Sequence, residues 1–113
     1  MRETEEIRVP AIAFLGEQDG PVERDLKVKL TELFLLEISI SRVSLARVHY
    51  HDSPVDSVAL CLRSDSPPER ALVDKIGKVF ASLFNGREHL DILFLNEQQQ
   101  VSVDKCCKPF FQR

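Results

Sequence analysis

Aromatic and clustered basic side chains are scarce in this sequence. It has no tryptophan and one tyrosine, Tyr50, and its 15 lysines and arginines are outnumbered by 18 acidic residues, which gives a net charge of −3. Proteins that bind nucleic acids need clustered Lys and Arg for the phosphates and aromatic faces for the bases. We therefore expect no nucleic acid among the partners of this chain.

Long apolar runs are absent as well. No run approaches the roughly 18 apolar residues of a membrane-spanning helix, and the opening MRETEEIRVP is charged where a signal peptide has an apolar core. The three cysteines, Cys61, Cys106 and Cys107, make an odd number, and a disulfide between adjacent cysteines is strained. We expect all three to be reduced, no membrane association and a cytoplasmic location.

Motifs that carry chemistry are also missing. The sequence has no G-x-S-x-G, P-loop, G-x-G-x-x-G or C-x-x-C pattern. His49 and His51 share a strand face, with Asp52 or His89 as further candidates, but zinc needs three or four protein ligands. The adjacent cysteines sit at a predicted helix end, which disfavours the thiolate, so we expect both to be inert and at least one to be buried. We expect no metal, no cofactor and no enzymatic activity.

Hydrophobic periodicity divides the chain into expected strands and helices. Residues 1–6 are an acidic tail that we expect to be mobile, and residues 7–113 form a single expected domain. Alternating patterns predict strands, and spacing of three and four predicts helices. The expected elements are a strand over 7–16, a helix over 21–37 with Pro21 in its first turn, strands over 42–51 and 56–63, a helix between a capping box at Ser66 and a stop at Asn85–Gly86, a strand over 90–96, and a short helix from Asn96 to Pro109.

This order, β-α-β-β-α-β, is that of the split βαβ arrangement. We therefore expect an α+β protein with a ferredoxin-like, four-stranded antiparallel sheet, two long helices on one face and an extra C-terminal helix. Two helices cover only one face of such a sheet, yet the strands over 7–16 and 90–96 are apolar on both faces. The second face needs cover from the terminal segment, with Val103, Cys106 and Phe110 at helical spacing, or from a second copy of the chain.

Phe110 and Phe111 lie near the end of the chain, where polar residues are usual. One interpretation is that both phenylalanines pack on their own sheet, because large apolar side chains are usually buried. The other is that at least one of them anchors a partner, since aromatic side chains dominate the energetics of interfaces. The expected partner is then the protein itself, as a homodimer, or another protein.

The end of the chain resembles a known family. The run HLDILFLNEQQQVSVDKCCKPFFQR is similar to the C-terminal domain of the SseB family, named for enhanced serine sensitivity, in which a strand, a short variable helix and Pro-Phe-Tyr with a basic residue follow one another. Leu90–Leu93 and Pro109–Phe111 occupy the strand and the terminal motif, with Phe111 where the family usually has tyrosine.

The resemblance covers about residues 9–113. SRVSLARVHY is similar to a family strand, with Ser44–Leu45 where Ala-Tyr is usual, and FLGEQDGPVERDLKVKL is similar to the opening segment, with Pro21 and Leu26 in place. Family members usually carry an N-terminal domain that this sequence does not show. The resemblance implies a bacterial cytoplasmic protein and no catalytic residues.

A second resemblance offers an alternative function. The same element order, with an Asp-Gly-Pro loop entering the first helix, looks like an ACT domain, a small regulatory module that binds amino acids. Gly16, Asp19 and Gly20 would then lie near the ligand. The two hypotheses are a non-catalytic interaction module, associating through the second sheet face and the Phe110–Phe111 end, and an ACT-like amino-acid sensor.

Overall fold

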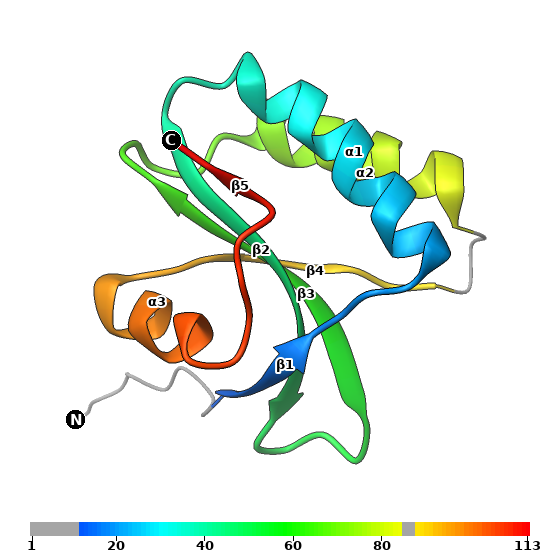
Figure 1. Cartoon of the computed structure of the whole chain (residues 1–113), viewed down its shortest axis with the longest axis vertical. Coiled ribbons are helices and arrows are strands. Elements are labelled where there is room, and N and C mark those ends of the chain that lie inside the picture. Colours follow the sequence, from blue (N-terminus) through cyan, green and yellow to red (C-terminus); the bar gives the residue numbers. More distant parts are fainter. Residues whose placement is uncertain (1–11, 85–87) are drawn as a thin grey trace.

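The computed structural model describes residues 12–84 and 88–113 and shows an α+β fold (Figure 1). Three expectations fall on residues outside these ranges: the acidic tail over 1–6, the beginning of the strand over 7–16 and the helix stop at Asn85–Gly86. The elements are β1 (Ile12–Glu17), α1 (Pro21–Leu35), β2 (Ile40–Tyr50), β3 (Asp56–Ser64), α2 (Arg70–Leu83), β4 (Asp91–Phe94), α3 (Glu97–Asp104) and β5 (Phe111–Gln112).

The sheet is mixed and has the order β1-β2-β3-β4, with β5 pairing with β2. β1 and β5 run antiparallel to β2, β2 antiparallel to β3, and β3 parallel to β4. The expectation of an all-antiparallel sheet was therefore wrong, and the ferredoxin-like topology is not confirmed. In a split βαβ unit another strand separates the two strands that a helix connects. Here α1 connects β1 and β2, which are direct neighbours, with β1 paired antiparallel to residues 46–50 of β2.

Both long helices pack on one face of the sheet, as expected (Figure 1). Helix α1 contributes Leu26, Leu30 and Phe34, each four residues apart and at most 1% exposed. Helix α2 contributes Leu72 and Ile76 to the same cluster. The sheet side of this cluster is formed by Val43, Leu45, Leu60 and Leu62.

Helix α2 begins later than the sequence suggested. The expected capping box at Ser66 does not form: the helix starts at Arg70 and has no side-chain cap. The Ser66 backbone N–H instead takes part in a turn with the Ser64 hydroxyl, at 3.2 Å. A residue before proline is disfavoured in the helical conformation, so Pro68 keeps Pro67, and Pro67 keeps Ser66, out of the helix.

The second face is covered by the terminal segment of the same chain. Val103 of α3 and Cys107 pack on the small side chains Ala46, Ala59 and Cys61. Because side chains alternate along a strand, Ala46 and Ala59 face the opposite side from Leu45 and Leu60. The expected cover is confirmed, but Cys107 rather than Cys106 supplies it.

Helix α3 is positioned by a full capping box, with Asn96 as the cap that the sequence predicts. The backbone N–H of Gln99 donates to the Asn96 side chain at 2.8 Å, and the Asn96 N–H donates to the Gln99 side chain at 2.9 Å. These two bonds satisfy donors at the first turn that have no partner within a helix. They hold the helix start next to the end of β4, where Gln100 faces the sheet.

Candidate functional site

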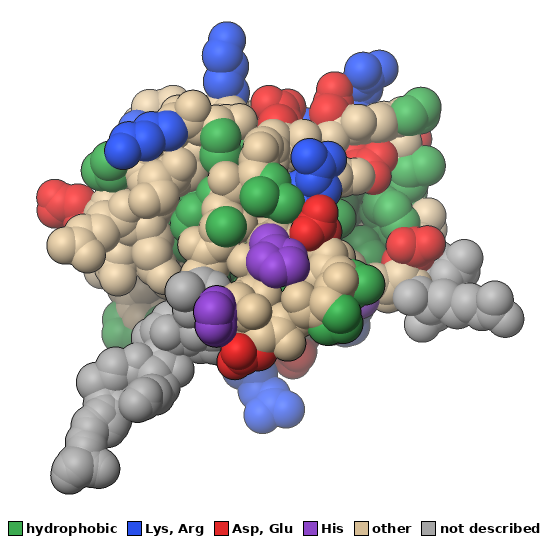
Figure 2. Space-filling view, turned by 90° about the horizontal axis from the view of Figure 1, so that it is seen from below, with side chains coloured by type: hydrophobic (Ala, Val, Ile, Leu, Met, Phe, Trp, Pro, Cys, Tyr) green, Lys and Arg blue, Asp and Glu red, His purple; other side chains and the backbone are tan. Residues whose placement is uncertain are grey.

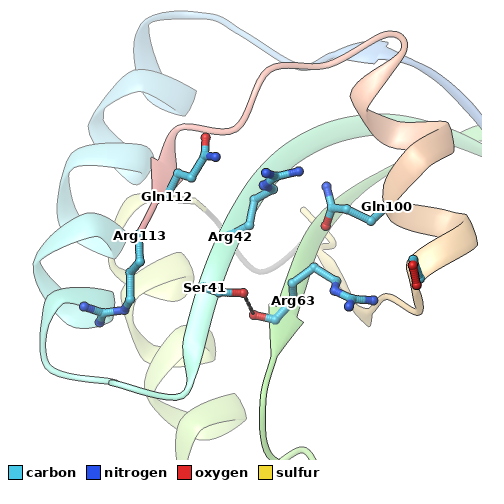
Figure 3. Close-up of a pocket in the computed structure, with 7 residues that line it drawn as sticks. Ser41, Arg42, Arg63, Gln100, Gln112 and Arg113 are labelled. Carbon is cyan, nitrogen blue, oxygen red and sulfur yellow. Dashed lines mark hydrogen bonds between the residues drawn. The ribbon is translucent and has the colours of Figure 1, made fainter.

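A polar hollow of about 260 Å³ lies where β2, β3, α3 and the C-terminal residues meet. Figure 3 shows Ser41, Arg42 and Arg63 on the strands with Gln100 of α3 reaching toward them, whereas Arg113 points away toward α1. The lining residues are Ser41, Arg42, Arg63, Gln100, Gln112 and Arg113, together with Glu97. Arg42 and Arg63 bring positive charge to the hollow, Glu97 brings negative charge, and the Asp104 carboxylate beside it is paired with Arg42. The guanidinium donors that Arg42 and Arg63 do not use within the protein can receive an anionic group.

An irregularity in β2 brings two successive side chains to the hollow. The β2–β3 register shifts between Ile40 and Arg42, as in a β-bulge. Successive strand residues normally point to opposite faces, and a bulge re-aims them. Ser41 and Arg42 therefore both line the hollow, and the Ser41 hydroxyl donates to the Arg63 carbonyl at 3.3 Å.

Two of the arginines are held in place but keep free donors. Nη1 of Arg42 donates to Oδ2 of Asp104 at 2.7 Å, and Nη1 of Arg63 donates to the carbonyl of Leu95 at 3.2 Å. A guanidinium carries five N–H donors in a fixed plane, so each side chain can also donate to a ligand. Each bond to the protein fixes the direction in which the remaining donors point.

Gln100 is the best-buried polar residue of the hollow. It is 8% exposed, and its Nε2 donates to Oδ1 of Asp104 at 2.8 Å. Its Oε1 is buried and has no hydrogen-bond partner within the described residues, a condition shared there only by the Ser44 hydroxyl, which lies outside the hollow. A buried acceptor without a donor costs about 1–3 kcal/mol. The Asp104 bond sets the amide orientation, because a flipped amide would face that carboxylate with its oxygen.

Arg113 is tied to the end of α1. Its Nε donates to the carbonyl of Ile40 at 2.7 Å, and its Nη2 donates to the carbonyls of Phe34 and Glu37 at 2.6 and 3.1 Å. A positive group near a helix C-terminus is favourable, since carbonyls there lack intrahelical partners. Arg113 thus organises the turn between α1 and β2, and a face of its side chain borders the hollow.

The two phenylalanines that the sequence singled out pack within the protein. Phe111 is 8% exposed, and its ring centroid lies 5.8 Å from that of Phe34 on the helical side of the sheet. Phe110 is half-buried against the same cluster and not on the second face. The Arg113 guanidinium lies 5.2 Å from the Phe111 ring centroid. The geometry supports the core interpretation for Phe111.

In the loop that contains Gly16, Asp19 and Gly20, the Asp19 side chain forms salt bridges with two residues of α1. The Asp19 carboxylate accepts from Arg24 at 3.2 Å and from Lys27 at 3.3 Å. These hydrogen bonds, from Arg24 first and then from Lys27, lower the pKa of Asp19. Gly20 forms the N-cap of α1 without a side-chain bond. The loop residues flank a second cavity of about 110 Å³ that is lined by Gln18 and Glu23 but not by the three predicted residues.

The histidines lie on the surface with separate acidic partners. Nδ1 of His49 lies 3.0 Å from Asp56 across the hairpin, and Nε2 of His89 lies 2.6 Å from Asp91. Figure 2 views the side of the β2–β3 hairpin and shows histidine, acidic and hydrophobic side chains interspersed rather than one apolar area. Within residues 12–84 and 88–113, no group of three His, Cys, Asp or Glu side chains is placed to hold a metal ion.

Asp91 also joins the far strands of the sheet. The Tyr50 hydroxyl donates to Oδ2 of Asp91 at 2.7 Å, which bridges β2 and β4 across β3. Burial and this hydrogen bond raise the pKa of Tyr50, which keeps its hydroxyl protonated. The pair therefore acts as a structural tie.

The three free cysteines differ in accessibility: Cys61 and Cys107 are buried and Cys106 is exposed. Burial raises the pKa of the Cys61 thiol to about 12 and that of Cys107 to about 11.

Only the thiolate reacts readily, so a disulfide reagent at pH 8 should modify one thiol quickly in the folded protein and all three after denaturation. Replacing Cys106 with serine should remove the fast reaction. Fast reaction of two thiols in the native protein would contradict this placement.

The hollow escaped prediction because its residues are dispersed. Arg42, Arg63, Gln100 and Arg113 come from four segments, and no local motif joins them. The run Gln98–Gln100 is too short to signal a site, and only its last residue is buried. Comparisons with family models, with curated proteins and with solved structures returned no match. No helix in the described part of the chain combines the length and hydrophobicity needed to cross a membrane.

Proposed function

We propose that this protein is a non-catalytic interaction or regulatory module that associates with a second copy of itself. The surface expected from sequence needs revision, because α3 covers the second sheet face and Phe111 points into the core. A different surface is available for association. It is the apolar corner formed by Leu35, Leu36 and Ile38, which lies beside Arg113. Exposure of these three side chains, at 62%, 82% and 86%, is the observation that carries the proposal.

The apolar corner is held in a defined shape. The backbone N–H groups of Leu36 and Glu37 donate to the carbonyls of Leu33 and Phe34, and Arg113 binds carbonyls on either side of Ile38. A preorganised turn loses little conformational freedom on binding. Leu36 and Ile38 therefore lie in an ordered turn, rather than a flexible loop, before a partner binds.

Charges around the corner suit a second copy. In a two-fold interface the same patch occurs on both sides, so each patch must complement itself. The apolar corner is bordered by Glu32, which is exposed on α1, by Glu37, and by the basic Arg113. Acidic residues of one copy can thus face the arginine of the other while the apolar side chains meet. This complementarity favours self-association over an unrelated partner.

The test is a concentration series followed by light scattering and sedimentation. We expect the wild-type protein to shift from monomer to dimer, and the double variant Leu36→Asp, Ile38→Asp to remain a monomer with an unchanged melting temperature. Val101→Asp is the matched control, since Val101 is 53% exposed on α3, away from the apolar corner. A wild-type protein that stays monomeric at millimolar concentration would refute the proposal, as would a double variant that still dimerises.

The second hypothesis, an ACT-like amino-acid sensor at Gly16, Asp19 and Gly20, has weaker support. The carboxylate of Asp19 is engaged by Arg24 and Lys27, so a ligand at this loop would compete with two cations of the protein. Membership of the SseB family and a bacterial cytoplasmic setting are also proposals. The sequence resemblance supports them, and the free state of Cys61, Cys106 and Cys107 agrees with a reducing compartment.

A further inference from the structure

The hollow contains hydrogen-bonding groups that have no partner among the described residues. Arg42 and Arg63 keep guanidinium donors beyond their bonds to Asp104 and Leu95, and these donors face a space of about 260 Å³. Arginines in such positions take a carboxylate or a phosphate, because the fork of N–H groups matches two oxygens. An anion is thus the first part of the expected ligand.

Gln100 supplies a second and independent requirement. Its Oε1 is buried without a partner, and Figure 3 shows its side chain reaching from α3 toward Arg42 and Arg63. Buried acceptors are nearly always hydrogen-bonded. A ligand that only accepts hydrogen bonds, such as acetate, leaves this oxygen unsatisfied. The ligand must therefore also donate an N–H or O–H.

Glu97 indicates the nature of that donor. Glu97 and Gln100 are three positions apart on α3, so their side chains emerge on the same side of the helix, and both line the hollow. A carboxylate and an amide oxygen together suit an ammonium group, which is positively charged and offers three donors. Arg42 and Arg63 come from the strands and suit a negative group with the donors that remain beyond the Arg42–Asp104 and Arg63–Leu95 bonds. The hollow is polarised, with acceptors on the helix and cationic donors on the strands.

We propose that the hollow binds a free α-amino acid, with its carboxylate on Arg42 and Arg63 and its ammonium group on Gln100 and Glu97. One tetrahedral carbon joins these two groups in an amino acid, so a single small molecule satisfies both sides of the hollow. The site differs from the loop at Gly16, Asp19 and Gly20 and is independent of self-association. A dimer that binds no amino acid would leave the proposed self-association standing.

Calorimetric titration of the full chain with the common amino acids tests the proposal, with acetate, methylamine and inorganic phosphate as single-charge probes. At least one amino acid should bind ten or more times tighter than acetate or methylamine. Failure of every amino acid to bind would overturn the proposal. Phosphate or acetate binding as tightly as the best amino acid would also overturn it and would identify a simple anion site.

Paired variants locate the two halves of the ligand. Arg42→Gln should weaken binding of the amino acid at least tenfold, whereas Arg47→Gln, an exposed arginine on the same strand, should leave it unchanged. Gln100→Met should weaken amino-acid binding at least tenfold but leave acetate binding unaltered, with the exposed Gln98→Met as its control. Circular dichroism confirms folding of each variant. Undiminished amino-acid binding by folded Gln100→Met would show that the unpaired oxygen does not recognise a ligand.

Discussion

Replacing Phe111 with alanine is expected to lower the free energy of unfolding by about 3–5 kcal/mol. The ring is 8% exposed and packs against Phe34, which is fully buried on the inner side of α1. Truncation removes apolar burial, the aromatic contact and the ring beneath Arg113, and it leaves a cavity between helix and sheet. For a domain with a total stability of about 5–15 kcal/mol this is a large fraction.

Denaturation by urea, followed by circular dichroism, measures this loss. Gln112→Ala is the control, because Gln112 follows Phe111 in β5 and is exposed. The experiment should be run at two protein concentrations, since self-association would stabilise the folded state by mass action. A loss below about 1 kcal/mol for Phe111→Ala, combined with loss of association, would restore the interpretation that this residue anchors a partner.

Replacing Arg113 with alanine is expected to lower the free energy of unfolding by about 2 kcal/mol, because hydrogen bonds from charged groups contribute about 1.5–3 kcal/mol to stability. Its guanidinium donates to the carbonyls of Phe34, Glu37 and Ile40, three acceptors at the end of α1 and in the following turn. Arg113→Lys should recover only part of the loss, since an ammonium group cannot copy the planar fork that reaches several carbonyls.

A local measurement separates this effect from general destabilisation. The amides of Glu37 and Ile40 close the turn by donating to Phe34 and Glu37, and their hydrogen exchange should accelerate in Arg113→Ala. Lys108→Ala, an exposed change in the same terminal segment, should leave both rates unchanged. If Arg113→Ala keeps the stability and the exchange rates of the wild type, the contacts of Arg113 are incidental.

The local patterns of the sequence predicted the elements well, because each depends on residues that are close together. Helical spacing of Leu26 and Leu30 and the cap at Asn96 correspond to α1 and α3. Hydrophobic residues on both strand faces likewise predicted that the second face would be covered. These properties follow from burial and backbone geometry over a few residues.

Strand pairing could not be predicted in the same way. Periodicity identifies a strand but does not say which edge its neighbour takes, so the parallel β3–β4 pair and the attachment of β5 to β2 were missed. The hollow was missed for a related reason. Arg42, Arg63 and Gln100 become neighbours only through the bulge in β2 and the placement of α3, both of which are tertiary features.

Strand β2 has one side completed by two short segments from distant parts of the chain. β1 pairs with it over 46–50, and β5 pairs with it over 42–43, on the side away from β3. During synthesis, β1 and β3 leave the ribosome before β5, so Arg42 and Val43, although paired with β3 on one edge, have no partner on the other edge until residue 112 has emerged. An open strand edge invites pairing with other nascent chains. The emergence of β5 therefore decides when this edge of β2 stops being available to other chains.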